Sequence, residues 1–152
     1  MAYVTAEARQ YLLDDIAEAI DHIGMALAAL AAAYELLDER SADKLEEELF
    51  RRVQTAYGRA QKTHAAFAAR YGLPGRTFSQ PSAGLPSQGV KVFLERAVES
   101  VDEAEGTLID LQDSLRPIEV GDPELRAGLA EVRELVGDLR SRSREFMRTF
   151  GR

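Results

Sequence analysis

The sequence predicts an all-α protein, an antiparallel up-down-up-down four-helix bundle, and three observations lead to this prediction. Apolar residues recur in alternating steps of three and four along four stretches, which is typical of helices that bury one face. No stretch alternates apolar and polar residues with the two-residue period of a strand. The length of 152 residues suits one core, so a single domain over 1–152 is expected.

The first two helices are expected at about 5–38 and 41–71. The apolar series of the first runs through Ile16, Ile20, Ile23, Leu27, Leu30, Tyr34 and Leu37. That of the second runs through Phe50, Val53, Tyr57, Ala60, His64, Phe67 and Tyr71. Ser41 is placed to cap the start of the second helix, and Gly72 to end it. The connection around Arg40 is short, so these two helices are expected to be antiparallel neighbours.

The last two helices are expected at about 88–115 and 122–150. Pro117 ends the third helix because proline has no N–H to donate, and Asp122 followed by Pro123 is typical of a helix start. Between the second and third helices lies a loop over 73–87 that holds three of the five prolines. Fifteen residues are long for a link between bundle helices, so this loop can also carry a crossover.

The composition excludes several classes of protein. The chain is 45% apolar, which is too much for a disordered chain, and it has no cysteine. Disulfide frameworks, cysteine-ligated zinc, iron–sulfur clusters and thiol nucleophiles are therefore excluded. The formal net charge of −7 argues against a nucleic acid or an anionic membrane as the main partner.

The charge alternates in sign from helix to helix. The stretches 5–38, 41–72, 88–115 and 122–152 carry net charges of −6, +2, −5 and +1. In an up-down-up-down bundle each acidic helix would lie between two basic ones, and ion pairs along the helix flanks would select that arrangement.

No targeting or membrane segment is recognised in the sequence. The first ten residues, MAYVTAEARQ, lack the basic and apolar regions of a secretory signal. The longest uncharged apolar stretch, Ile23–Tyr34, has twelve residues, whereas a helix needs about 20 to cross a bilayer. A cytoplasmic protein is therefore expected, with no membrane partner.

His64 is the first candidate for chemistry because it stands in the apolar series of the second helix. In an antiparallel hairpin that turns near residue 40, the numbers of facing residues add up to about 80. His64 would then lie level with Ile16, within a turn of Asp15 and Glu18. Such a histidine–carboxylate pair can bind a metal ion or relay a proton. Alternatively, His64 is a core residue whose ring is satisfied by one carboxylate or carbonyl.

His22 is the second histidine, and it falls on a line of the first helix with Ala19, Ala26, Ala29 and Ala33. It is expected about two turns from His64, so the two rings would not share an ion. Neither histidine completes the Glu-x-x-His motif of ferritin-like di-iron bundles. The residue three positions before His64 is Gln61, and the residue three positions before His22 is Ala19.

The third helix offers a second metal site, with Glu95, Glu99 and Asp102 on one face. Glu99-x-x-Asp102 resembles half of the paired acidic motifs of the all-helical nucleotide pyrophosphatases, and the resemblance implies a Mg²⁺-dependent hydrolase. Candidates for the other half are Glu131-x-x-Glu134 and Glu18-x-x-Asp21. Against a metal site stands the simpler interpretation of a solvated acidic face.

Histidine-phosphotransfer bundles provide a further comparison. Their phosphorylated histidine is partly exposed and is followed by Lys-Gly, where this chain has Phe67 and Ala68 after His64. Phosphotransfer through His64 would require an exposed ring.

The first helix is apolar on all sides over Ile23–Tyr34, and a helix that is apolar on all sides is buried on all sides. The residues opposite its main apolar series are therefore expected to contact a second copy of the chain or a partner helix. The predicted interface consists of Met25, Ala28, Ala29 and Ala32.

These observations favour a non-catalytic interaction or scaffolding protein that self-associates through its first helix. No catalytic constellation or cofactor motif is recognised, so catalytic residues and cofactors are predicted to be absent. The alternative is a bundle that binds Mg²⁺, Mn²⁺ or iron, either through His64 with Asp15 or Glu18, or through Glu95, Glu99 and Asp102 as in an all-helical hydrolase. A phosphotransfer module is a further alternative.

Overall fold

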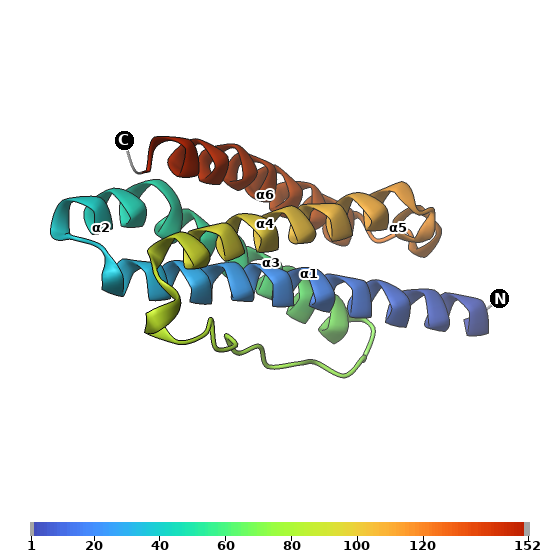
Figure 1. Ribbon diagram of the computed structural model, residues 1–152. Helices are drawn as coiled ribbons and strands as arrows, with labels where there is room; N and C mark the ends of the chain where they lie inside the picture. Colours follow the sequence, from blue (N-terminus) through green and yellow to red (C-terminus); the bar gives the residue numbers. More distant parts are fainter. Residues whose placement is uncertain (1, 151–152) are drawn as a thin grey trace.

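A computed structural model describes residues 2–150 of the chain, with side chains from residue 6 onward. Over this range the chain is built from helices and connections and contains no strand, so the prediction of an all-α protein is confirmed (Figure 1). Four long helices pack side by side: α1 (Ala2–Leu36), α3 (Arg51–Arg70), α4 (Val90–Asp113) and α6 (Pro123–Thr149). A short α2 (Glu39–Leu45) leads into α3 through a π-helical turn at Glu46–Phe50, and α5 (Arg116–Val120) joins α4 to α6.

Local sequence accounts for most helix ends. The second helical segment begins one turn earlier than predicted, because Asp38 and not Ser41 is its cap: the Ser41 N–H donates to Asp38 Oδ1 at 2.7 Å. Gly72 takes the left-handed conformation, with φ 62°, that ends α3, and the Leu73 N–H donates to the Ala68 carbonyl at 2.9 Å. Asp122 caps α6 as predicted, accepting from the Leu125 N–H at 2.8 Å.

Neighbouring helices in the bundle are antiparallel. Ion pairs join Arg52 to Asp138 and Arg59 to Glu131, so residue numbers rise along α3 while they fall along α6. Between α4 and α6 the pairs Asp102–Arg144 and Glu105–Arg140 follow the same rule. The hairpin of α1 and α3 also has the predicted register, since Gly24 lies against Tyr57.

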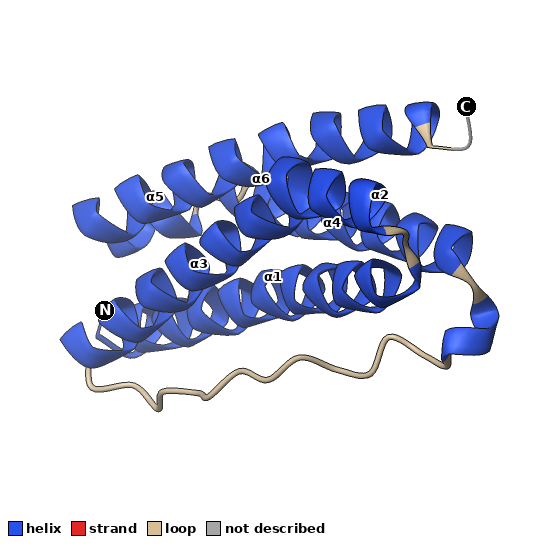
Figure 2. Ribbon diagram, turned by 90° about the vertical axis from the view of Figure 1, so that its left-hand side faces the viewer, coloured by secondary structure: helices blue, strands red, loops and turns tan. Residues whose placement is uncertain are grey.

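The order in which the chain visits these positions differs from the prediction. Residues 73–89, called the strap below, run back along the whole bundle before α4 begins, so α3 and α4 point in the same direction (Figures 1 and 2). Alternation of direction at every connection is therefore not confirmed. The 24 residues of α4 span about 36 Å. The strap ends in a 3-10 turn at Pro86–Gln88, and the 13 extended residues before it, 73–85, can reach about 43 Å, which is enough for this crossover.

The crossover makes α1 and α4 neighbours, and α1 packs more extensively on α4 than on any other helix. The line of α1 that holds Ala19, Ala26 and Ala29 also holds His22, whose Nδ1 lies 3.0 Å from Glu103 of α4. Small residues on this line allow the two helices to approach closely. The two most acidic helices are thus adjacent, contrary to the charge-based prediction. Each exposed ion pair contributes only about 0.2–1 kcal/mol, so packing decides the arrangement.

The central part of α1 is a core helix. Its large side chains Leu12, Ile16, Ile20 and Ile23 are all buried. By length and composition the segment Ala6–Leu36 is apolar enough to cross a membrane, and 67% of its apolar window is buried inside the fold. This segment is longer than the uncharged stretch Ile23–Tyr34 because a membrane-spanning window can include one or two charged residues.

Candidate functional site

His64 is a buried residue, with 2% of its surface exposed. Its ring lies 5.1 Å from the ring of Phe78 in the strap, at an interplanar angle of 90°. Among the described side chains, no hydrogen bond to the imidazole is found. Burial lowers the pKa of His64 below its ordinary value, and the nearby Arg76 charge lowers it further against the opposing effect of Asp14.

The carboxylates predicted to pair with His64 lie on a different side of α1. Asp15 contacts Arg116 of α5 at 3.4 Å, and Glu18 lies 3.9 Å from His22. The predicted cluster of His64, Asp15 and Glu18 is therefore not assembled. The hairpin arithmetic gives the level of a residue along the bundle but not the side of the helix from which its side chain projects.

His22, and not His64, lies beside carboxylates, and only one of them, Glu18, was predicted for His64. Glu103 Oε2 lies 3.0 Å from Nδ1, and Glu18 Oε1 lies 3.9 Å from Nε2. The two carboxylates approach opposite edges of the ring, so they cannot ligate one ion together with the same ring nitrogen. Within residues 6–150, no group of three histidine or acidic side chains is arranged to hold a metal.

The acidic residues predicted to share one face of α4 have different surroundings, with Glu95 and Glu99 exposed and Asp102 partly buried. Glu95 lies 3.9 Å from Lys91, and Glu99 projects into solvent. Asp102 accepts from Arg144 of α6 at 2.9 Å. Glu131, a candidate for the second half of the pyrophosphatase-like motif, pairs with Arg59 on the α3 side of α6.

The phosphotransfer alternative required an exposed His64 ring. His64 is 2% exposed and its ring lies against Phe78, so the exposed ring that phosphotransfer would require is not present in this conformation.

The chain itself covers much of the predicted self-association surface. Ala29 is completely buried and lies on the line of α1 that faces α4, while Ala28 is 8% exposed. Met25 and Ala32 are partly exposed. Asp21, Met25, Ala28 and Ala32 share one helix face by their spacing, and Arg76 of the strap forms an ion pair with Asp21 on that face. The strap therefore runs past one end of the face that was predicted to contact a second chain.

A large surface depression lies where α1, α4 and α5 meet, and it is called the acidic groove below. It has a volume of about 590 Å³. Its charged lining comprises four carboxylates and one guanidinium: Asp15, Glu18, Asp110, Glu119 and Arg116. Thr107, Leu111, Ser114 and Leu115 complete its wall. The groove is a direct result of placing two acidic helices side by side.

Large apolar side chains stand exposed beside the acidic groove. Leu115, in the connection between α4 and α5, is 65% exposed. Ile118, in α5, is 62% exposed. Tyr11 is 52% exposed, with the Arg116 guanidinium 4.7 Å from its ring centroid. Burial raises the pKa of Asp15, with Glu18 and Asp14 adding to this effect and Arg116 opposing it. The Asp15 carboxylate is therefore incompletely compensated by the chain's own cation.

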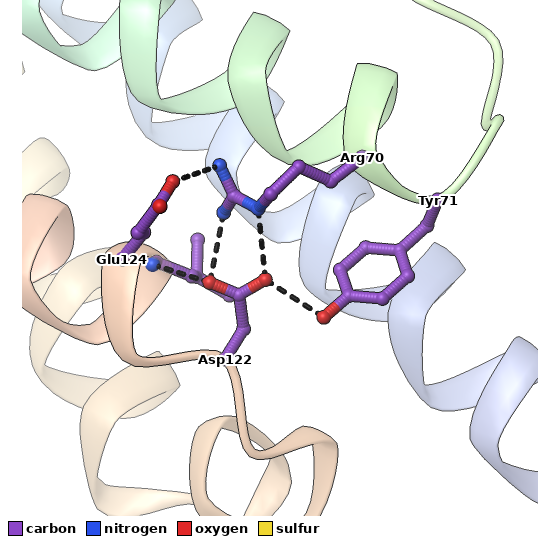
Figure 3. Close-up of polar contacts among 5 residues, drawn as sticks. Arg70, Tyr71, Asp122 and Glu124 are labelled. Atoms are coloured by element: carbon purple, nitrogen blue, oxygen red, sulfur yellow. Dashed lines mark hydrogen bonds and ion pairs between the residues drawn. The ribbon is translucent and has the colours of Figure 1, made fainter.

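Asp122 forms the best-satisfied polar cluster in the described part of the chain (Figure 3). Its carboxylate accepts from Arg70 Nε and Nη2 at 3.0 and 2.8 Å, from the Tyr71 hydroxyl at 2.7 Å and from the Leu125 N–H. Burial alone would raise the pKa of Asp122, but these hydrogen bonds outweigh burial and lower it. Every acceptor position is occupied, so the cluster is a clamp between α3 and α6 that leaves no group free for a ligand.

The acidic groove and the α5 helix were not foreseen. The sequence does hold one signal for this region: Leu115 and Ile118 flank Arg116-Pro117 in a short connection. Large apolar residues in such a connection can mark a contact surface. Without knowing which helix lies beside α4, the sequence gives no reason to group Asp15 with Asp110.

Comparisons with known proteins return no match: no family model, no curated protein and no solved structure is similar to this chain.

Proposed function

We propose that this protein is a non-catalytic interaction protein that binds a basic, amphipathic segment of a partner protein in the acidic groove. The observation that carries the proposal is the groove itself, where three carboxylates of the adjacent helices α1 and α4 and one of α5 surround a single arginine. Like charges that are adjacent and only partly compensated attract a partner of opposite charge.

The shape and lining of the acidic groove support a peptide segment as its occupant. Leu115 and Ile118 offer apolar contacts beside the carboxylates, and exposed apolar residues with a polar rim are typical of protein–protein contact surfaces. A helix or extended segment that carries lysines or arginines at one edge and leucines at the other would pair with both features. Its cations would compete with Arg116 for Asp15, whose contact at 3.4 Å is long for an ion pair.

The proposed role is that of a cytoplasmic single-domain protein. The burial of most of the apolar window of α1 within the bundle supports a helix that serves as core. Self-association through Met25 and Ala32 remains a prediction, which sedimentation at micromolar concentration would test. A monomer at that concentration would contradict it.

The docking proposal is tested with a synthetic 18-residue peptide of leucines and lysines at helical spacing, against a matched peptide in which glutamates replace the lysines. We expect the lysine peptide alone to bind, and the double variant Glu18→Lys, Asp110→Lys to lose at least about tenfold in affinity, or about 1.4 kcal/mol. The control is the variant Asp43→Lys, Glu47→Lys, which makes the same change in net charge on exposed residues around α2.

The measurement is the dissociation constant from fluorescence anisotropy, at low and at physiological salt. Equal losses in the groove variant and in the α2 control would mean that only net charge matters, and the docking proposal would then be wrong. Equal binding of the glutamate peptide would also contradict it.

A further inference from the structure

Few contacts hold the middle of the strap against the bundle. Arg76 pairs with Asp21 of α1 at 2.9 Å, and its guanidinium lies 4.6 Å from the centroid of the Phe78 ring. Phe78 in turn lies against His64 of α3. These contacts form one connected series that runs from α1 through the strap to α3.

Backbone structure contributes little to this attachment. Between Pro74 and Gly84 no backbone–backbone hydrogen bond joins the strap to a helix. Leu73, Phe78 and Ala83 pack on the core, and Arg96 of α4 donates to the Ala83 carbonyl near the end of the strap. Phe78 is therefore the main apolar anchor of the middle of the strap, and His64 lies directly beneath it (the strap runs below α1 in Figure 2).

A proton on His64 would change the balance at this anchor. His64 is 2% exposed and no hydrogen bond to its ring is found in the described structure, so burial disfavours the charged imidazolium. Two charged groups act on the ring: Arg76 of the strap repels an imidazolium, and Asp14 of α1 attracts it. Burial and Arg76 outweigh Asp14, and the pKa of His64 is lowered.

The sign of the pH effect follows from this direction. The closed strap requires a neutral His64 ring. The free energy that favours the closed strap is therefore at its maximum above about pH 6.5, the ordinary pKa of histidine. It decreases as the pH falls below that value towards the lowered pKa of the buried ring. Opening relieves the cost because the imidazolium then reaches water.

We propose that the strap is a pH-sensitive latch: protonation of His64 releases Phe78 and the middle of the strap from the α1–α3 seam while the four long helices stay folded. Release uncovers the face of α1 that carries Met25, Ala28 and Ala32. The latch is independent of the proposed docking, because the acidic groove lies on a different side of α1, between α1, α4 and α5.

The test uses the absence of tryptophan from the chain. Phe78→Trp places a single tryptophan on the strap, and its emission maximum reports whether the anchor is buried or in water. Between about pH 7.5 and about pH 5 we expect a shift to longer wavelength with a midpoint below the ordinary histidine value. Helicity measured by far-ultraviolet circular dichroism should stay constant through this transition.

Two variants in the Phe78→Trp background separate the latch from general acid effects. His64→Leu, which cannot titrate, should keep the short-wavelength emission at both pH values. His22→Gln removes the other histidine, which lies between α1 and α4 and not beside the strap. This variant should keep the emission shift. The latch is overturned if the emission shift persists without His64, or if it coincides with loss of helicity.

A measurement on the unmodified chain decides the matter if a variant fails to fold. Nuclear Overhauser contacts between the rings of His64 and Phe78 should be present near pH 7.5 and lost once the His64 ring has titrated. Contacts that survive the titration would contradict the latch. With only two histidines in the chain, the His64 resonances can be assigned by comparison with His22→Gln.

Discussion

Asp122 illustrates how a single residue fixes the junction between two helices. It ends the α5–α6 connection, caps α6 and accepts a two-pronged hydrogen bond from Arg70 at the end of α3. The sequence predicts only the cap, because a helix N-terminus is a local feature. The pairing with Arg70, 52 positions away, depends on which helix lies beside α6, and local sequence does not contain that information.

At the residue scale, we expect Asp122→Ala to lower the free energy of unfolding by about 3–5 kcal/mol. The change leaves the Arg70 guanidinium partly buried without its main partner and removes the cap of α6. Urea denaturation followed by circular dichroism measures the loss. Glu124→Ala is the matched control, because Glu124 contacts the same arginine at 2.9 Å from an exposed position and should cost about 1 kcal/mol or less. Equal losses in the two variants would contradict the clamp.

At the scale of elements, small residues decide how closely the helices approach. Gly128 of α6 lies against Thr63 of α3, and a Cβ at position 128 would come within 2.7 Å of the Thr63 hydroxyl oxygen. Gly58 of α3 has open space around it, and a Cβ at position 58 would meet no atom of a neighbouring element within 4 Å. The two glycines look alike in the sequence, and only the packing distinguishes them.

This difference predicts opposite effects of the same substitution. Gly128→Ala should lower the free energy of unfolding by about 1–3 kcal/mol, because α6 must move away from Thr63. Gly58→Ala should raise it by about 0.5–1 kcal/mol, because alanine restricts the unfolded chain and favours the helix. Both are measured by urea denaturation. Loss of stability in Gly58→Ala, or a gain in Gly128→Ala, would contradict the described packing of α3 on α6.

At the scale of the whole molecule, the strap determines which helices are neighbours. A short connection between α3 and α4 would place α4 antiparallel to α3 and give the predicted alternating order. The strap instead returns the chain to the far end of the bundle, so α4 packs against α1 (Figure 1). This choice puts two acidic helices together and creates the acidic groove.

Shortening the strap should therefore disrupt the whole molecule. Deletion of residues 77–84 leaves nine connecting residues, which reach about 30 Å, less than the roughly 36 Å length of α4. We expect loss of the native monomer, either by unfolding or by exchange of helices between chains. Replacing the same eight residues with glycine and serine should keep the fold, because the length is preserved.

Light scattering coupled to gel filtration, together with thermal melting, separates these outcomes. A shortened chain that stays monomeric with native stability would mean that the crossover does not have to span the bundle.

The sequence by itself determined the helical class, the approximate bounds of the four long helices, the register of the α1–α3 hairpin and the cap at Asp122. These features depend on periodicity and on residues close together in the chain. Tertiary structure alone decided the order of the helices, the separation of His64 from Asp15 and Glu18, and the assembly of the acidic groove. The physical reason is that a loop such as 73–87 permits two directions for the next helix. Close packing of the alanine-rich face of α1 against α4, which outweighs weak surface electrostatics, then selects between them.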